Sequence, residues 1–174
     1  MSRNIAPIIA DSLKLGLANA NRLRVGITPE NFSTFAKPGG ETVVANHPSF
    51  IFGHLAIYPS RIVSQLGQDA SSITADAEFD ALYNQKATCQ DDPDGSIYPS
   101  MEVVMDLFER THAAALQAIE AADDEQFVQP NPNEAMRATF GTMGSMHAFY
   151  VGGHIMLHMG QLSTWRRAMG MAPA

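Results

Sequence analysis

Four long stretches of this sequence repeat apolar residues at the spacing of an amphipathic helix, and this periodicity constrains the fold more than any other feature. The stretches are residues 5–25, 49–66, 99–122 and 142–169. Alternation of period two, which indicates a half-buried strand, is almost absent. Helices of this kind bury their apolar faces against one another, so the expected fold class is all-α, a four-helix bundle.

Proline and glycine mark the expected limits of the second helix. Pro48 suits its first turn, because the missing N–H of proline would be unpaired there in any case. Gly67 suits the position just after its last turn. Pro59 lies inside the helix, where the loss of a backbone donor predicts a kink.

The connections between helices differ in length. Between helices 2 and 3 we expect a long loop, residues 67–98, that carries a short helix at 77–83 and helps to shape a pocket. Single helical turns are expected at 29–35 and 134–140.

Length and charge place the chain among globular proteins of acidic character. Its 174 residues suit a single domain, 1–174, and Cys89 is the only cysteine, so no intrachain disulfide can form. The formal net charge is −7, and Arg166 and Arg167 are the only adjacent basic pair, so we expect neither a nucleic-acid partner nor a basic membrane-binding patch. No apolar run approaches the roughly 20 residues of a transmembrane helix, and no secretory signal is evident, so a cytoplasmic location is expected.

Two of the six histidines, His154 and His158, lie four residues apart on the fourth predicted helix. At 3.6 residues per turn their side chains share one face, where two imidazoles can chelate one metal ion. Their neighbours Ile155 and Leu157 are apolar, and burying histidines among such residues costs free energy unless the rings find partners. The alternative is a pair of ordinary polar residues on a solvated face.

His54 is the candidate third ligand. It lies among apolar residues in the second predicted helix, beside Gly53, whose missing side chain permits close approach of another helix. The alternative is a core histidine bonded to a backbone carbonyl. Opposite a helix with two histidines four residues apart, the metal-ligand interpretation is favoured, and the predicted site is His54, His154 and His158.

The other three histidines receive different predictions. His147 precedes His154 by seven residues, so we expect it to line the cavity or to be structural. His47 is expected to be a helix cap or a surface residue, and His112 a surface or boundary residue.

Three nitrogen ligands leave coordination positions open, as in reactive metal sites. Such ligands suit one divalent transition metal, Zn or Ni first, with Fe and Cu as alternatives, and do not select among them. The pair is not the zinc-protease motif, because Ile155 stands where that motif has glutamate. The helix therefore carries no evident general base.

Two segments resemble motifs of the DinB-like superfamily. Residues 46–55, NHPSFIFGHL, resemble its second-helix motif, and residues 154–162, HIMLHMGQL, followed by the arginine pair, resemble its fourth-helix motif. With the order and number of helices, the resemblance covers essentially the whole chain. It implies a four-helix bundle whose metal ligands are His54, His154 and His158. It also implies kinship with thiol-dependent S-transferases and mycothiol-dependent maleylpyruvate isomerase, and a homodimeric assembly.

Three further residues are candidates for roles near the metal. Tyr58 and Arg61 follow His54 by four and seven residues, so they share its face and could orient a substrate or donate a proton. The alternative is a packing tyrosine and a surface arginine. Gln161 follows His158 by three residues and is a candidate hydrogen-bond partner of that ligand.

The histidine pattern thus predicts a divalent-metal-binding protein, and we expect it to act as an enzyme on a small-molecule substrate. The resemblance implies thiol-dependent transfer, isomerisation or a related hydrolysis, with a low-molecular-weight thiol as co-substrate. One alternative is a non-catalytic metal-binding bundle that serves as a sensor, store or scaffold. Another is a bundle whose histidines only pack against one another.

Overall fold

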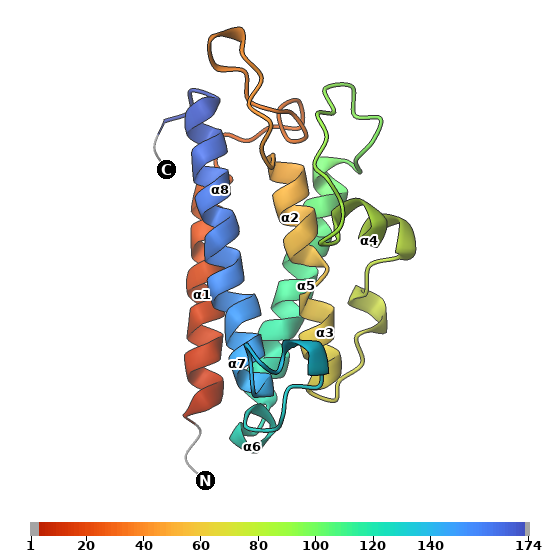
Figure 1. The fold of residues 1–174 in the computed structure, drawn as a ribbon, viewed down its shortest axis with the longest axis vertical. Coiled ribbons are helices and arrows are strands. Elements are labelled where there is room, and N and C mark those ends of the chain that lie inside the picture. The colour runs from red at the N-terminus through yellow and green to blue at the C-terminus, as the bar shows by residue number, and fades with distance from the viewer. Residues whose placement is uncertain (1–3, 173–174) are drawn as a thin grey trace.

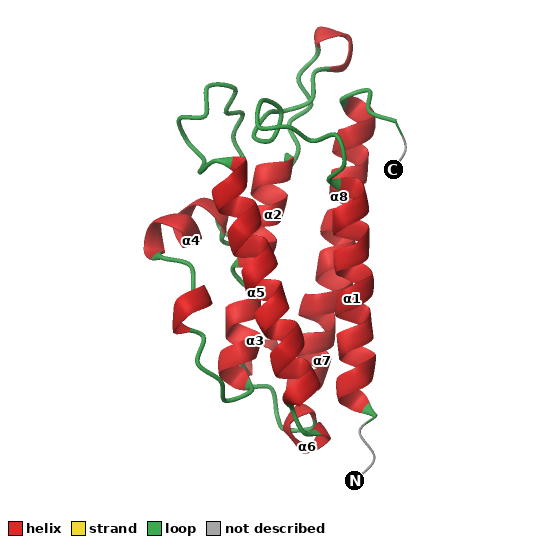
Figure 2. Ribbon diagram, turned by 180° about the vertical axis from the view of Figure 1, so that it is seen from behind, coloured by secondary structure: helices red, strands yellow, loops and turns green. Residues whose placement is uncertain are grey.

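The computed structural model describes residues 4–172, and its long elements are helices that run along the long axis of the molecule (Figure 1). No strand forms within these residues, and Figure 2 shows only helices and loops. The predicted all-α class is therefore confirmed for the described part of the chain. The ends of the predicted 1–174 domain, residues 1–3 and 173–174, lie outside it. The four long helical segments are made up of α1 (Ile5–Leu23), α2 (Pro48–Ala56), α3 (Pro59–Gln65), α5 (Met101–Ala121), α7 (Met143–Ala148), η4 (Phe149–Gly153) and α8 (His154–Ala168).

The second predicted helix is two helices, α2 and α3, because Pro59 interrupts it. Proline cannot donate to the preceding turn, and α2 accordingly ends at Ala56 while α3 begins at Pro59. Both pieces pack against α5, and α2 also contacts α8. The predicted kink is confirmed, and so is the stop at Gly67, whose φ is 80°.

Shorter elements occupy the connections. The region 67–98 was expected to be mostly loop, and residues 77–83 form the short helix predicted within it. Asp76 caps this helix by accepting a hydrogen bond from the Phe79 N–H at 2.8 Å. The turn expected at 29–35 is wrong as a helix, since that stretch folds as consecutive turns. The short elements are η1 (Pro38–Gly40), η2 (Ser71–Ile73), α4 (Ala77–Tyr83), α6 (Asp124–Phe127) and η3 (Glu134–Met136).

The fourth predicted helix is interrupted by a turn of π-helix. Thr142 caps its start, where the side-chain oxygen accepts from the Ser145 N–H at 3.2 Å. The chain then passes from α7 through the π-helical η4 into α8, which begins at His154. Single π-turns of this kind occur within α-helices and are frequent at functional sites.

Small residues let α1 lie close against η4 and α8. A side chain at Gly16 would stand 3.1 Å from Ile155, and one at Gly152 would collide with the Ser12 hydroxyl. Two larger apolar residues of α1, Ile8 and Leu15, point to solvent with 71% and 61% of their surface exposed. The buried stripe of α1 is Ala6, Ile9, Ala10, Leu13, Gly16, Ala20 and Leu23.

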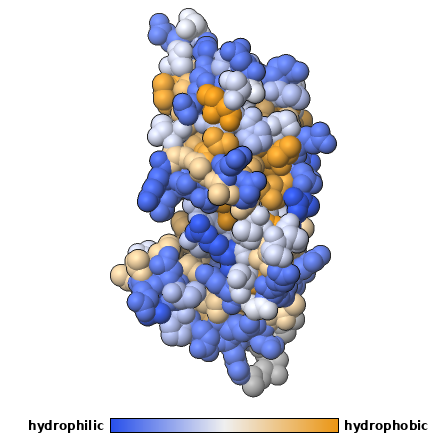
Figure 3. Space-filling model, turned by 90° about the vertical axis from the view of Figure 1, so that its right-hand side faces the viewer, coloured by the Kyte–Doolittle hydropathy of each residue, from blue (hydrophilic) through white to orange (hydrophobic). Residues whose placement is uncertain are grey.

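The outer surface is mixed in character. The face on the side of α4 is mainly hydrophilic, with hydrophobic side chains gathered in its upper half (Figure 3). Among residues 4–172, no helix has both the length and the apolar character that crossing a bilayer demands.

Candidate metal centre

Three imidazoles meet between α2 and α8. His54 is in the last turn of α2, His154 is the first residue of α8, and His158 follows one turn later. The Nε2 atom of His154 lies 3.2 Å from Nε2 of His54 and 3.1 Å from Nε2 of His158. All three residues are buried, with 7 to 9% of their surface exposed. The structure therefore brings together the three predicted ligands in a group that could hold a metal ion.

The backbone of α4 fixes the protonation of His54. The Nδ1 atom of His54 lies 2.6 Å from the carbonyl oxygen of Tyr83, and a carbonyl oxygen can only accept a hydrogen bond. The proton is therefore on Nδ1, and the Nε2 lone pair points at the other two rings. Metal-binding histidines commonly donate their second N–H to such a carbonyl.

Gln161 plays the corresponding part for His158. Its side-chain oxygen lies 2.9 Å from His158 Nδ1 and accepts a second hydrogen bond from the Asn46 amide at 3.1 Å. With the proton on Nδ1, the Nε2 lone pair of His158 also faces the centre of the group. The prediction that Gln161 is a hydrogen-bond partner of His158 is confirmed.

Aromatic packing, without an outer hydrogen bond, orients His154. Its Nδ1 is buried with no hydrogen-bond partner. The rings of Tyr58, Phe149 and Tyr150 lie 5.0, 5.5 and 6.1 Å from its ring centre. The third imidazole thus sits within an aromatic enclosure that holds it against the other two.

A single proton on His154 cannot give both neighbouring imidazoles a good hydrogen bond. Two Nε2 lone pairs point at His154, and its single Nε2 proton, if present, serves only one of them well. Burial disfavours the charged form, lowering the pKa of His154 to about 3 and that of His158 to about 4, with the neighbouring imidazoles adding to the effect. Burial also lowers the pKa of His54. All three rings are therefore neutral at pH 7 and present nitrogen atoms to one point.

The spacing of the nitrogens fits a metal ion. Nitrogen ligands at the zinc distance of about 2.0–2.1 Å, set at tetrahedral angles, lie about 3.3 Å apart. The two separations in the structure, 3.2 and 3.1 Å, are close to this value. Neutral imidazoles, two of them with outer hydrogen bonds, match the donor set of a transition-metal site.

Tyr58 lies against the group and Arg61 lies behind Tyr58. The Tyr58 ring centre is 5.0 Å from those of both His54 and His154. Burial raises the pKa of its phenol, which therefore remains protonated at neutral pH. The Arg61 guanidinium is 5.1 Å from the Tyr58 ring centre, and its residue is exposed. Of the two candidates, Tyr58 packs directly against His54 and His154, whereas Arg61 contacts Tyr58 and acts on His54 only through its charge.

His147 does not join the group, because seven residues, about 10.5 Å along a helix, separate it from His154 and the π-turn between them also changes the phase of the helix. On a continuous α-helix, seven residues would place it on the face of His154. The π-turn holds more residues than an α-turn, so the two faces no longer coincide. His147 instead lies 2.8 Å from the side-chain oxygen of Gln65 and packs edge-on against Phe127. Of its two predicted roles, the structure supports the structural one.

The remaining histidines are buried, against the surface positions expected for them. His112 is 2% exposed and lies 2.7 Å from the Phe108 carbonyl oxygen on α5, so its surface or boundary assignment is wrong. His47 caps α2 as predicted, since its Nδ1 accepts from the Phe50 N–H, but it is fully buried. A local hydrogen bond satisfies each ring, which is why a single polar residue can enter the core there.

The buried histidines make the protein sensitive to acid. Burial lowers the pKa of His112 from 6.5 to about 4, so between these values the unfolded chain binds a proton that the folded chain does not. Stability therefore falls as the pH falls through this window, by about 1.4 kcal/mol per unit for one such residue. We expect His112→Gln to flatten the pH dependence of the free energy of unfolding between pH 6.5 and 4, measured by urea denaturation. Parallel curves for the variant and the parent would contradict the assignment.

The outer hydrogen bond of His158 is expected to matter for metal affinity. Gln161→Leu removes the acceptor that fixes the His158 proton on Nδ1, and losing such a partner typically weakens metal binding about 10–100-fold. Competition with a chromophoric chelator measures the affinity. A Gln129→Leu variant, changed in a glutamine exposed at the surface, is the control, and equal affinities in both variants would show that the hydrogen bond is dispensable.

Several residues of the site were missed in the sequence. Tyr83 supplies its carbonyl from the 67–98 region, which carried no sign of that contact. Tyr150 and Phe50 each precede a ligand by four residues, and that helical spacing could have identified them. Cys89 is half-buried, and burial raises the pKa of its thiol to about 11, which disfavours a reactive thiolate.

Comparisons of the chain with family models, with curated proteins and with solved structures give no match. The metal site therefore stands on the geometry of its three imidazoles.

Proposed function

We propose that this chain is a divalent-metal-dependent enzyme with the four-helix bundle of the DinB-like superfamily, and that His54, His154 and His158 are its metal ligands. The observation that carries the proposal is the convergence of three Nε2 atoms. Two of them carry no proton, because the Tyr83 carbonyl and Gln161 hold the ring protons of His54 and His158 on Nδ1. The order of the long helices, with ligands on α2 and α8, supports the bundle and the resemblance.

The chain supplies a site suited to polar chemistry on a small molecule. When bound to three nitrogens, a metal with open positions lowers the pKa of a water or thiol and polarises a substrate oxygen. Tyr58 lies beside two of the ligands with its phenol protonated, so it can donate a hydrogen bond or a proton to a substrate atom. Phe50, Phe149 and Tyr150 exclude water around the imidazoles.

The reaction class follows from the resemblance. We propose a thiol-dependent transfer or isomerisation, with a low-molecular-weight thiol as co-substrate and a homodimer as the assembly. Zn and Ni are the metals proposed first, because neutral imidazoles suit both.

A second candidate function is metal binding without catalysis. It is favoured by the surroundings of the group: in the part of the chain described, none of the hydrogen bonds of the three imidazoles involves a carboxylate, so no carboxylate is held against them as a general base. A sensor, store or scaffold needs no such base.

Turnover assays separate these two functions. The protein is stripped with a chelator, reloaded with Zn or Ni, and tested with low-molecular-weight thiols against electrophiles and maleylpyruvate. We expect metal-dependent turnover that falls about 10²- to 10⁴-fold in Tyr58→Phe, the usual range for loss of a proton donor. Stoichiometric metal without turnover on any pair would leave the non-catalytic function.

A further inference from the structure

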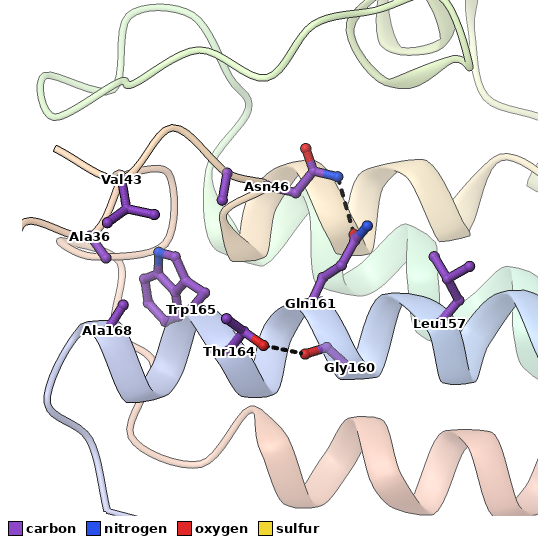
Figure 4. A pocket seen from close by; sticks show the side chains of 10 residues that line it. Ala36, Val43, Asn46, Leu157, Gly160, Gln161, Thr164, Trp165 and Ala168 are labelled. Carbon is purple, nitrogen blue, oxygen red and sulfur yellow. Dashed lines mark hydrogen bonds between the residues drawn. The ribbon is translucent and has the colours of Figure 1, made fainter.

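A hollow opens beside the three-histidine group of His54, His154 and His158 and shares Gln161 with its surroundings. It has a volume of about 570 Å³ and lies between α8 and residues 36–46 (Figure 4). This size is within the range of small-molecule sites. Its walls are largely apolar and include Val43, Leu157, Trp165 and Ala168. Val43 and Leu157 remain 40% and 55% exposed, as expected of apolar walls that lack a partner.

The polar groups of the hollow are all uncharged. They belong to Asn46, Gln161 and Thr164, and no Lys, Arg, Asp or Glu is among its lining residues. A charged ligand would lose its hydration here without gaining a counter-charge. The hollow therefore favours a neutral molecule.

Two of these polar groups connect the hollow to the three-histidine group through hydrogen bonds. Figure 4 shows the hydrogen bond between the Asn46 and Gln161 side chains, which lies between Trp165 and Leu157. The Gln161 oxygen that accepts this bond also accepts from His158 Nδ1. A molecule in the hollow would therefore lie one side chain away from a metal ligand.

We propose that this hollow binds an uncharged small molecule with a mainly apolar body and a hydrogen-bonding head, such as a carboxamide, that meets Asn46 and Gln161. The apolar body lies against Trp165 and the side chains across from it, while the head exchanges hydrogen bonds with the two amides. The idea that the hollow is the substrate site of a metal-dependent enzyme rests on the proposed function. The idea that the hollow binds such a molecule does not.

Trp165 provides a direct readout, because it is the only tryptophan of the chain. Its indole N–H donates to the Thr34 carbonyl at 2.9 Å, so the ring is held in the wall of the hollow. The probes are 4-phenylbutyramide and 4-phenylbutyrate, which share a carbon skeleton and differ in the charge of the head. Both are titrated into chelator-treated protein while tryptophan fluorescence is recorded, so the result does not depend on metal binding.

We expect saturable binding of the amide, at least about tenfold tighter than that of the carboxylate, because burying a charge without a partner is costly. Ala168→Leu fills the wall and is expected to weaken amide binding by about tenfold or more. Ala113→Leu, the same substitution at an exposed position on α5, leaves it unchanged. Circular dichroism confirms that each variant is folded.

A second variant tests the head group. Asn46→Leu keeps the size of the side chain and leaves the hydrogen bond between Gln161 and His158 in place. The variant should therefore still bind the phenyl body of the probe. It should lose the preference for the amide over butylbenzene. No saturable signal up to the solubility limit of the amide, equal binding of the carboxylate, or unchanged binding in Ala168→Leu would each overturn the proposal. Failure of the metal analysis would not affect it.

Discussion

Alanine in place of His154 is expected to remove the metal from the purified protein. His154 is the shared partner of the other two imidazoles, with nitrogen–nitrogen distances of 3.2 and 3.1 Å. Its loss leaves His54 and His158, on different helices, without the imidazole whose Nε2 atom both of them approach. Because even an outer hydrogen-bond partner is worth about 10–100-fold in metal affinity, we expect the loss of this ligand to exceed about 100-fold.

Elemental analysis checks this prediction on protein purified without chelator or affinity metal. The matched control is His112→Gln, which changes an equally buried histidine outside the metal group. We expect about one metal ion per chain in the parent and the control, and almost none in His154→Ala. Equal metal content in all three would show that the ion binds elsewhere. No metal in the parent, even after reconstitution, would mean that the three histidines only pack together.

Alanine in place of Gly53 is expected to disturb both the fold and the site. A side chain there would lie 2.5 to 2.6 Å from three carbons of the Tyr83 ring. That ring is fully buried and its hydroxyl is hydrogen bonded to Ser49, so it cannot simply move aside. Overpacking of this kind costs about 1–3 kcal/mol, whereas the helix propensity of alanine returns at most about 1 kcal/mol. The net effect is destabilisation, together with displacement of the carbonyl that orients His54.

Gly160→Ala is the matched control, because nothing lies within 4 Å of the position of its side chain. It lies inside α8, where alanine is expected to leave stability unchanged or to raise it by up to about 1 kcal/mol. Urea denaturation gives the stability of both variants, and chelator competition gives their metal affinity. Equal stability and affinity in the two would show that Tyr83 adjusts without consequence.

The meeting of the three histidines could be predicted from the sequence largely because it depends on local rules. His154 and His158 are one helical turn apart, and that spacing places them together whatever the rest of the fold does. Gln161 follows from the same geometry. His54 needed a further assumption, that its helix faces α8, which apolar surroundings on both helices made reasonable.

The contacts that complete the site depend on how distant segments pack, and periodicity does not report this. Tyr83 reaches His54 from α4, and its approach depends on the absence of a side chain at Gly53. The glycine was expected to admit another helix, and the structure shows that it admits the Tyr83 ring at the end of α4. His112 was misplaced for a related reason: a histidine that bonds to the carbonyl of its own preceding turn needs no solvent, and sequence pattern treats it as polar.

The π-turn at Phe149–Gly153 also bears on how this chain can vary by insertion and deletion. A turn of this type contains one more residue than the α-helix on either side would need. Removing a single residue there would restore an unbroken helix and rotate α8 against α7, so that Thr142 and the histidine ligands could no longer both keep their places. The count of residues between the helix cap and His154 is thus a constraint in its own right, independent of their identity. Alignments of related chains should conserve that count even where the aromatic residues within the turn are exchanged.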